Sequence, residues 1–405
     1  MNAGINKLIN TVNLSYFPET SLVQAQKASR LSPPNPAVGC ILLSPTGKLI
    51  GQGHTQAVGG SHAEVMALRD AAVQGESTFG ATVYVTLEPC SHFGRTPPCC
   101  NALIEAKVAK VVIAVLDPNP LVAGKGVELL QKAGIEVEVL PVDHTQAKAA
   151  KELMIGFFSR MVRKTPWVRV KIAASLDGKT ALGELGQGQS QWITSSEARD
   201  DGHAWRARAG AILTGIGTVL ADDPRLDVRT VPTQRQPHVV IVDSTLRIPL
   251  TAKLFAINII AKEAIKTTTR GIFIYTNSID STKKEALEER GATVIVLPQS
   301  EPFDASSKVN LHLVMQDLAK REINELHVEA GATLNGALIS AGLVDEFLIY
   351  VAPKLLGGKD INGRGMADFA PLADLTQALP LDFVSVDKVG PDVRLLARVT
   401  GRDAF

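Results

Sequence analysis

The feature that most constrains this chain is one histidine and two cysteines spaced as zinc ligands. The run is His62-Ala63-Glu64, then Pro89-Cys90, then Cys99. One imidazole and two thiolates suit zinc, and three protein ligands leave the fourth tetrahedral position open for water, as in a catalytic site. The order H-x-E, P-C and C is typical of zinc deaminases, whose glutamate is a general acid and base and not a ligand. The fold must therefore bring these segments together, and we expect hydrolytic deamination of an amidine-like ring carbon with Glu64 catalytic.

Two structural interpretations compete with this one. Ser61 and Glu64 also fit a helix capping box, with Ser61 as N-cap. The second is a structural zinc site that only stabilises the fold. Such a site needs a fourth protein ligand, and no further cysteine or histidine stands at ligand spacing nearby. Cys100 adjoins Cys99 and would point elsewhere on a helix, and Cys40 lies in an apolar run, as a buried small hydrophobe does.

Length and composition narrow the class. A chain of 405 residues exceeds what one hydrophobic core usually serves, so we expect two domains. The net charge of +1, without a long basic block, argues against nucleic acid or a membrane surface as partner and favours a small ligand. Four cysteines, two of them metal ligands, suit a reducing cytoplasm. No apolar stretch approaches the ~20 residues of a membrane span, and the first twenty residues lack a signal-peptide pattern.

The first half alternates strand and helix patterns, which favours a three-layer α/β domain. Strands are expected at 37–43, 81–87, 110–116 and 135–140, and helices at 62–74 and 124–133. This order puts His62 at a helix start and Cys90 just past a strand. The loop Asp117-Pro118-Asn119-Pro120 follows a strand, at the edge where α/β sheets bind ligands.

A helical connector over 144–163, between Pro141 and Pro166, leads to a second α/β domain. Its strands are expected at 167–174, 210–214, 238–243, 271–276, 292–297, 325–330 and 345–352, and its helices at 195–208, 311–321 and 333–341. Two final strands, 382–388 and 392–399, predict an antiparallel hairpin at one sheet edge. We therefore expect an N-terminal extension over 1–20, a deaminase domain over 21–143, a connector over 144–165 and a second domain over 166–405.

A second site is indicated where Glu329 and a glycine-containing turn, Gly331 to Gly336, follow a strand and open a helix. Backbone N–H groups at such a helix start can hold a nucleotide phosphate, although many such turns are only turns. Arg206 and Arg229 are candidates to clamp a substrate phosphate. Arg199 and Arg208 lie on the same predicted helix as Arg206, so position alone does not choose among the three.

These motifs resemble those of one family, the bifunctional riboflavin-biosynthesis deaminase/reductase. In the first domain the matching runs are Pro34 to Cys40, His62-Ala63-Glu64, Thr86 to Cys99, and Asp117 to Pro120. In the second they are Ser175 to Lys179, Ser190 to Thr194, Thr218 to Pro224, and Val328 to Gly331. The long gap from Cys90 to Cys99 differs from the short P-C-x-x-C of nucleoside deaminases.

The resemblance implies a cytidine-deaminase-like three-layer α/β/α domain followed by a dihydrofolate-reductase-like α/β domain. The first would bind Zn²⁺ and deaminate 2,5-diamino-6-(ribosylamino)-4(3H)-pyrimidinone 5′-phosphate. The second would use NADPH to reduce the ribosyl chain, giving 5-amino-6-(ribitylamino)uracil 5′-phosphate. It further implies a cytoplasmic homo-oligomer, a dimer or a tetramer.

The resemblance also assigns site residues. The deaminase pocket would contain Asn35, His54, His92 and Arg95. The NADPH positions would be Ala173, Trp192, Thr218, Asp222, Ser244, Gly331, Ala332, Thr333, Leu334, Asn335, Gly336 and Ala337. The reductase substrate positions would be Ser190, Arg206, Leu226, Arg229 and Glu329. Lys171 and Asp177 are candidate proton donors. From the residues alone, Trp192 and His54 could equally be core side chains and His92 a surface imidazole.

The chain departs from the family pattern at two places, a shortened first helix over 21–30 and Met154 where the family often has asparagine. Two other functions stay open at this stage. One is a deaminase acting on bases of nucleic acid, which the balanced charge disfavours. The other is a zinc-stapled binding protein with one or both sites silent, which the intact Glu64 disfavours.

Overall fold

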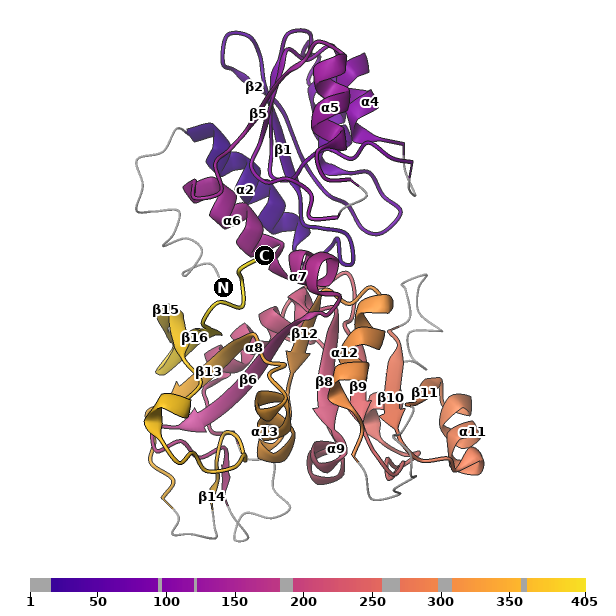
Figure 1. Cartoon of the computed structure of the whole chain (residues 1–405), viewed down its shortest axis with the longest axis vertical. Coiled ribbons are helices and arrows are strands. Elements are labelled where there is room, and N and C mark those ends of the chain that lie inside the picture. Colours follow the sequence, from indigo (N-terminus) through magenta and orange to yellow (C-terminus); the bar gives the residue numbers. More distant parts are fainter. Residues whose placement is uncertain are drawn as a thin grey trace. The chain divides into compact units, whose positions relative to one another are not determined.

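The computed structural model describes residues 16–93, 97–119, 122–182, 192–256, 270–297, 308–357 and 363–405. The chain forms two compact units (Figure 1). The N-terminal unit runs to Lys164 and includes Phe405, and the C-terminal unit spans Thr165–Ala404. Within the described residues, no helix is long and apolar enough to cross a membrane.

The N-terminal unit is built on a five-stranded sheet in the order β2-β1-β3-β4-β5. The strands are β1 (Gly39–Leu43), β2 (Leu49–His54), β3 (Thr82–Val85), β4 (Lys110–Ile113) and β5 (Glu136–Val139). Both neighbours of β1 run antiparallel to it, whereas β3, β4 and β5 are parallel. Four of these strands lie where the sequence predicts them; β2 was not predicted.

The strand β2 could not be recognised from the sequence, because the positions that face α3 are occupied by glycine, a poor strand former. A Cβ atom on Gly51 would lie 2.3 Å from the carbonyl oxygen of Ala67, and one on Gly53 would lie 2.4 Å from the Ala67 nitrogen. The helix therefore packs directly on the strand backbone, and this close approach excludes the side chains that would have marked the strand.

Helices cover both faces of this sheet. They are α2 (Tyr16–Ala28), α3 (Ala63–Val73), α4 (Cys99–Glu105), α5 (Lys125–Lys132), α6 (Thr145–Leu153) and α7 (Ile155–Arg163). Gly39 on β1 faces α2, whereas Gly53 on the neighbouring strand pairs with Cys40 and faces α3. Because adjacent residues of a strand point to opposite faces, α2 and α3 lie on opposite sides, which makes the three layers predicted. The connector is two helices broken at Met154, and α2 begins at Tyr16, before the helix expected over 21–30.

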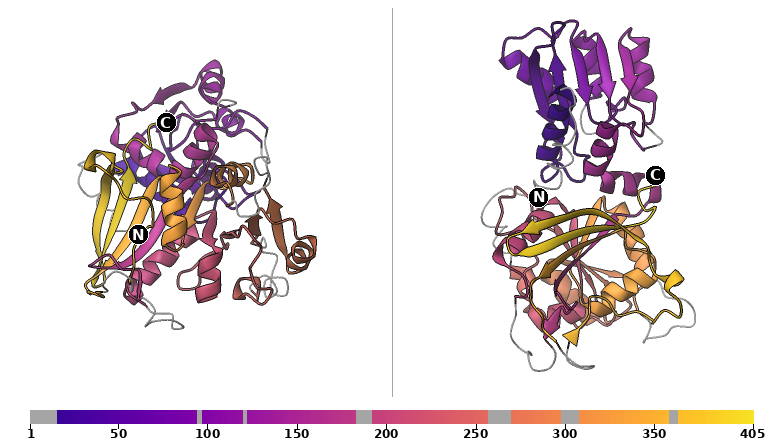
Figure 2. Two further views of the ribbon diagram at one scale, coloured as in Figure 1. Left: turned by 60° about the horizontal axis from the view of Figure 1, so that its bottom comes forward. Right: turned by 90° about the vertical axis from the view of Figure 1, so that its left-hand side faces the viewer.

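The C-terminal unit has a nine-stranded sheet in the order β11-β10-β9-β8-β12-β6-β13-β16-β15. The strands are β6 (Trp167–Ser175), β8 (Ala211–Gly215), β9 (His238–Val242), β10 (Ile272–Thr276), β11 (Ala292–Val296), β12 (Glu325–Val328), β13 (Glu346–Ala352), β15 (Leu381–Val389) and β16 (Asp392–Val399). The first seven are mutually parallel, and β15 and β16 form the predicted antiparallel edge hairpin (Figure 2, right).

Helices and short elements complete this unit. They are α8 (Ser196–Arg208), α9 (Ile216–Asp222), α11 (Ser281–Glu289), α12 (Leu311–Lys320), α13 (Ala332–Ser340), the 3-10 turns η2 (Lys253–Phe255) and η3 (Leu375–Gln377), and a small pair, β7 (Ala181–Leu182) with β14 (Gly363–Arg364). The three predicted helices are present; α9 and α11 were not predicted.

The two faces of the sheet centre differ in chemistry. On β6, Val168, Val170 and Ile172 belong to the main apolar core, which also contains Leu318 of α12 and Leu338 of α13. The alternate residues of β6 and β12 face the side where α8 packs, and many of them are charged. There Glu325 of β12 binds Arg169 of β6 and Arg208 of α8, both at 2.9 Å. This polar face leads to the site described below.

Candidate active sites

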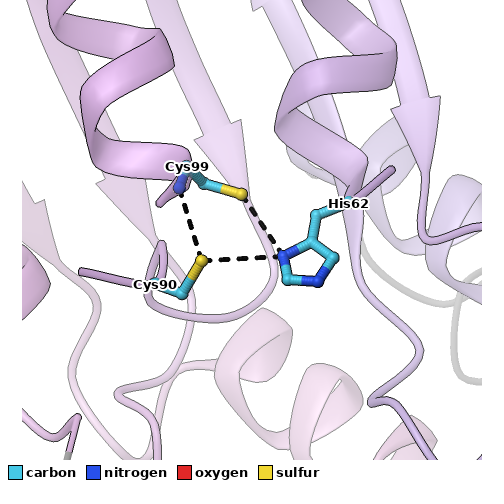
Figure 3. A group of neighbouring side chains, drawn as sticks. All are labelled: His62, Cys90 and Cys99. Carbon is cyan, nitrogen blue, oxygen red and sulfur yellow. Dashed lines mark hydrogen bonds between the residues drawn. The ribbon is translucent and has the colours of Figure 1, made fainter. Parts of the chain in front are cut away.

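Three segments bring His62, Cys90 and Cys99 together (Figure 3). His62 is the N-cap residue of α3, Cys90 follows β3, and Cys99 opens α4. Their ligand atoms all lie within 4.8 Å of one another. The His62 Nδ1 atom is 3.3 Å from the Cys99 Sγ atom and 3.6 Å from the Cys90 Sγ atom. The three predicted ligands therefore form one group.

The spacing of this group fits zinc. With metal–ligand bonds of about 2.1–2.3 Å, two ligands of a tetrahedral site lie about 3.6 Å apart, close to both nitrogen–sulfur distances. Among the described residues, no further His, Cys, Asp or Glu joins this group. The donor set thus matches a catalytic zinc site with one open position rather than a closed structural site.

Glu64 lies beside the metal group, in the first turn of α3, and is 4% exposed. Burial and the negative charge of Cys90 raise the pKa of Glu64 to about 7. A group with a pKa near neutrality can both accept and release a proton at working pH. The capping-box interpretation is wrong: α3 begins at Ala63, with His62 as N-cap and no side-chain cap.

The other two cysteines are buried and take no part in the metal group. Cys40 is fully buried on β1, and burial raises its pKa well above the usual value. The Cys100 Sγ atom donates to the carbonyl oxygens of Pro89 and Gly126, at 3.3 and 3.7 Å. Cys40 is therefore a buried packing residue and Cys100 points away from the metal group, as predicted.

The remaining residues predicted for the deaminase pocket are less closely gathered. Asn35 is half-buried before β1. His54 ends β2 opposite Gly39, on the α2 face, and its pKa is lowered by burial and by the charge of Lys27. His92 is exposed two residues after Cys90. Arg95 lies outside the described residues.

In the C-terminal unit, the predicted cofactor and substrate residues gather where parallel strands end. Ala173 is near the end of β6, Thr218 and Ser244 follow β8 and β9, and Glu329 follows β12. Since β9, β8, β12 and β6 are consecutive in the sheet, their carboxyl ends form one edge, the usual ligand edge of an α/β sheet.

Arg206 and Glu329, both predicted substrate residues, bind each other. Two guanidinium nitrogens of Arg206 donate to the Glu329 carboxylate, one of them at 2.8 Å, and its Nη1 atom donates to the Asp227 carbonyl at 2.9 Å. The side chains are only 14% and 16% exposed. Burial alone would raise the pKa of Glu329, but the charge and hydrogen bonds of Arg206 hold it well below the usual value.

The structure separates the three arginines of α8 that position alone could not rank. Arg208 binds Glu325 at 2.9 Å. Arg199 stacks on Trp192, with its guanidinium 4.7 Å from the ring centroid. Of these three arginines, only Arg206 contacts Glu329 at the strand edge. Trp192 is 61% exposed, so its interpretation as a core aromatic is wrong.

A tightly held segment after α9 carries the other substrate candidates. Leu226 is buried with φ +49°, and the half-exposed Arg229 binds Asp227 at 2.7 Å. The Arg229 N–H donates to the Nδ1 atom of His203 at 3.4 Å. Sequence reasoning missed His203 and Asp227, although His203 stands one helical turn before Arg206. Ser190 lies outside the described residues.

The glycine-containing turn forms the start of α13, with Gly331 as N-cap and no side-chain cap. A Cβ atom on Gly331 would lie 4.0 Å from the Thr218 Oγ1 atom, so these two candidates are neighbours, and the uncapped helix start suits a phosphate. Asn335 and Gly336 are instead buried. The Asn335 amide donates to the Met366 carbonyl at 2.9 Å, and a Cβ atom on Gly336 would collide with the Asp368 carbonyl.

The two candidate proton donors have different surroundings. Lys171 lies on β6 with its Nζ atom 5.9 Å from the centre of the Tyr350 ring, and burial lowers its pKa. Asp177 accepts N–H groups of Leu356 and Gly357 at 3.0 and 2.7 Å, and a hydrogen bond from Ser175 together with these lowers its pKa to about 2. Asp177 is therefore ionised, and it holds the backbone of Leu356 and Gly357 in place.

Comparison with known proteins connects both units to one family. Residues 166–395 match the RibD C-terminal domain, and residues 12–115 match the cytidine and deoxycytidylate deaminase zinc-binding region. The riboflavin biosynthesis protein RibD of Escherichia coli K12 is 42% identical over 94% of this chain and 98% of its own length. That of Aquifex aeolicus is 37% identical over 95% and 98%.

Solved structures agree. Acinetobacter baumannii RibD is 39% identical and superposes with a TM-score of 0.79, covering 95% of this chain and 98% of that one. A Thermotoga maritima diaminohydroxyphosphoribosylaminopyrimidine deaminase/5-amino-6-(5-phosphoribosylamino)uracil reductase is 28% identical with a TM-score of 0.76, covering 95% and 97%.

These matches favour neither a nucleic-acid deaminase nor a zinc-stapled binding protein, because the full-length relatives pair a zinc-binding deaminase domain with a reductase domain. The chain belongs to the RibD family, the bifunctional deaminases and reductases of riboflavin biosynthesis that use zinc and NADPH.

Proposed function

We propose that the N-terminal unit deaminates 2,5-diamino-6-(ribosylamino)-4(3H)-pyrimidinone 5′-phosphate and that the C-terminal unit then reduces its ribosyl chain. The same pair of reactions is named for the Thermotoga maritima protein. The observation that carries the proposal is the convergence of His62, Cys90 and Cys99 beside the buried Glu64.

In the deaminase site, His62, Cys90 and Cys99 would hold zinc, which when bound supplies a water activated for attack on a ring carbon. Glu64 would carry one proton of the attacking water to the ring nitrogen and then the second proton to the amino group, which leaves as ammonia. The buried position of Glu64 beside the three ligands supports this role. Asn35, His54, His92 and Arg95 remain predicted contacts to the substrate.

In the reductase site, NADPH supplies the hydride, and the chain mainly orients the two reactants. Arg206, Glu329 and Arg229 would bind the substrate, with Ser190 and Leu226 as further predicted contacts. The start of α13 would hold a cofactor phosphate. Of the two candidate proton donors we favour Lys171, because the Asp177 carboxylate already accepts hydrogen bonds from Ser175, Leu356 and Gly357.

The remaining predictions extend this function. We infer that the deaminase domain covers 21–143, the connector 144–165 and the reductase domain 166–405. We also infer a homo-oligomer, a dimer or a tetramer, that works in the cytoplasm, where the cysteine ligands stay reduced.

The test is to supply the diamino substrate with NADPH and follow ammonia and NADPH together. We expect one ammonia released for each NADPH oxidised, with ammonia appearing first. NADPH oxidation before any ammonia would reverse the order we propose. Binding of the substrate that weakens steeply with salt, as for nucleic acid, would also contradict a small-molecule site.

A further inference from the structure

A buried carboxylate, that of Glu88, stands two residues before the first cysteine ligand, Cys90. Glu88 is 3% exposed, and among the described residues no cation pairs with it. It accepts four backbone N–H groups instead. The Oε2 atom accepts those of Asp117 and Gly124 at 3.2 and 3.0 Å, and the Oε1 atom accepts those of Gly126 and Val127 at 2.9 and 3.3 Å. All four donors belong to the stretch from β4 into α5.

The same stretch is tied to both cysteine-bearing segments. A Cβ atom on Gly126 would lie 2.2 Å from the Pro89 carbonyl oxygen and 3.0 Å from the Glu88 Oε1 atom, so the loop packs directly on the residues before Cys90. Cys100, next to the ligand Cys99, donates to the Pro89 and Gly126 carbonyls. Glu88 thus connects the Cys90 segment to Asp117, Gly124, Gly126 and Val127, and Cys100 connects the start of α4 to the same place.

We propose that Glu88 is a positioning residue of the zinc site: by accepting the backbone N–H groups of Asp117, Gly124, Gly126 and Val127 it fixes the Cys90 segment, so that both thiolates are held in place to bind the metal. Groups that orient metal ligands from outside the coordination sphere commonly decide metal affinity. The carboxylate is needed because its two oxygens only accept, whereas glutamine would offer one accepting oxygen and an NH₂ that opposes two of the four donors. The inference rests on the zinc site proposed above.

The test is E88Q in the full chain. We expect the zinc Kd, measured by competition with a chromophoric chelator, to rise by about 10- to 100-fold. The amide hydrogens of Asp117, Gly124, Gly126 and Val127 should exchange faster. A cooperative thermal unfolding transition of the N-terminal unit should be retained, which shows that the unit carrying the change is folded, and NADPH-dependent reduction of supplied deaminated intermediate should stay at the parent rate.

The matched control is D70N in the same unit. Asp70 also accepts a backbone N–H, that of Gln52 at 2.8 Å, but takes no part in the metal group. Its zinc Kd should equal that of the parent. If E88Q does not fold, G126A is the second variant. Its added methyl group would push against the Pro89 carbonyl and the Glu88 carboxylate, and it should weaken zinc binding in the same way.

Either variant, folded and with a zinc Kd within twofold of the parent, overturns the proposal. So does an equal loss of zinc affinity in D70N, because that would be a general effect of destabilisation. A parent chain that binds no zinc would overturn the metal site itself, which is a distinguishable result.

Discussion

Replacing Arg206 with alanine should impair the reductase in two separable ways. The first is stability, because the change leaves the Glu329 carboxylate, only 16% exposed, without its guanidinium partner. Removing one partner of a buried ion pair lowers the free energy of unfolding by ~3–5 kcal/mol. Because this pair is partly exposed, we expect the lower end of that range, about 3 kcal/mol. For a unit of this size, each kcal/mol shifts Tm by roughly 2–4 °C, so we expect a fall of about 6–12 °C.

The second effect is on the reaction. A charge-assisted hydrogen bond to substrate contributes ~1.5–3 kcal/mol, so kcat/KM for reduction at saturating NADPH should fall about tenfold or more. The assay is run well below the lowered Tm, with the deaminated intermediate supplied and ammonia release from the diamino substrate as the internal control. R229A is the comparison variant, and its Tm should fall less than that of R206A, because Arg225 still pairs with the Asp227 carboxylate at 2.9 Å after the change.

An unchanged kcat/KM in R206A would refute the substrate role and transfer it to Arg229 or another residue. An unchanged Tm would refute the ion-pair argument, since a solvated helix arginine changes stability by no more than about 0.5 kcal/mol. A parallel loss of deamination would show that the two units are coupled.

Three further predictions concern both units. E64Q should keep zinc bound and the fold intact yet abolish ammonia release, because Glu64 moves protons and is not a ligand; loss of the metal in that variant would contradict the assignment. C99S should lose zinc and deamination while reduction of supplied intermediate continues, because the two units have separate cores; joint loss would show the opposite. Burial and the charges of Arg206 and Arg229 lower the pKa of His203 from 6.5 to about 4, so the unfolded chain binds more protons in that window. The Tm of the C-terminal unit should therefore fall as pH decreases from 6.5 to 4, and H203Q should flatten that part of the curve; an identical curve would show that His203 is not the titrating group.

Much of the fold could be predicted because periodicity and residue type agree. The parallel strands of the C-terminal unit are continuous apolar or alternating runs, and their bounds differ from the predicted ones by one or two residues in most cases. The elements that were missed have a physical reason. In β2, Gly51 and Gly53 serve the close approach of α3 and remove the strand pattern. The connector pattern continues through Met154, whose φ of −114° breaks the helix although the residue at the break is neither proline nor glycine.

The metal site could be predicted because its three ligands belong to a recognisable sequence motif. The zinc group follows from three residue types at a fixed spacing, and the structure brings all three together. The contacts that these residues make with distant segments of the chain were not predictable. Asp227 meets Arg206 through a backbone carbonyl, and Glu88 meets four backbone amides. Backbone groups carry no residue identity, so no sequence pattern records these contacts.

The most direct test of the two-site account is one chelator experiment. The full chain is stripped of metal, given NADPH, and offered first the diamino substrate and then the deaminated intermediate, while ammonia and NADPH are measured together. The account predicts no ammonia and no NADPH oxidation with the first compound, normal NADPH oxidation with the second, and recovery of both steps on adding zinc. Ammonia release that persists without metal, or reduction of the intermediate that stops with it, would contradict a zinc deaminase and an independent NADPH reductase on one chain.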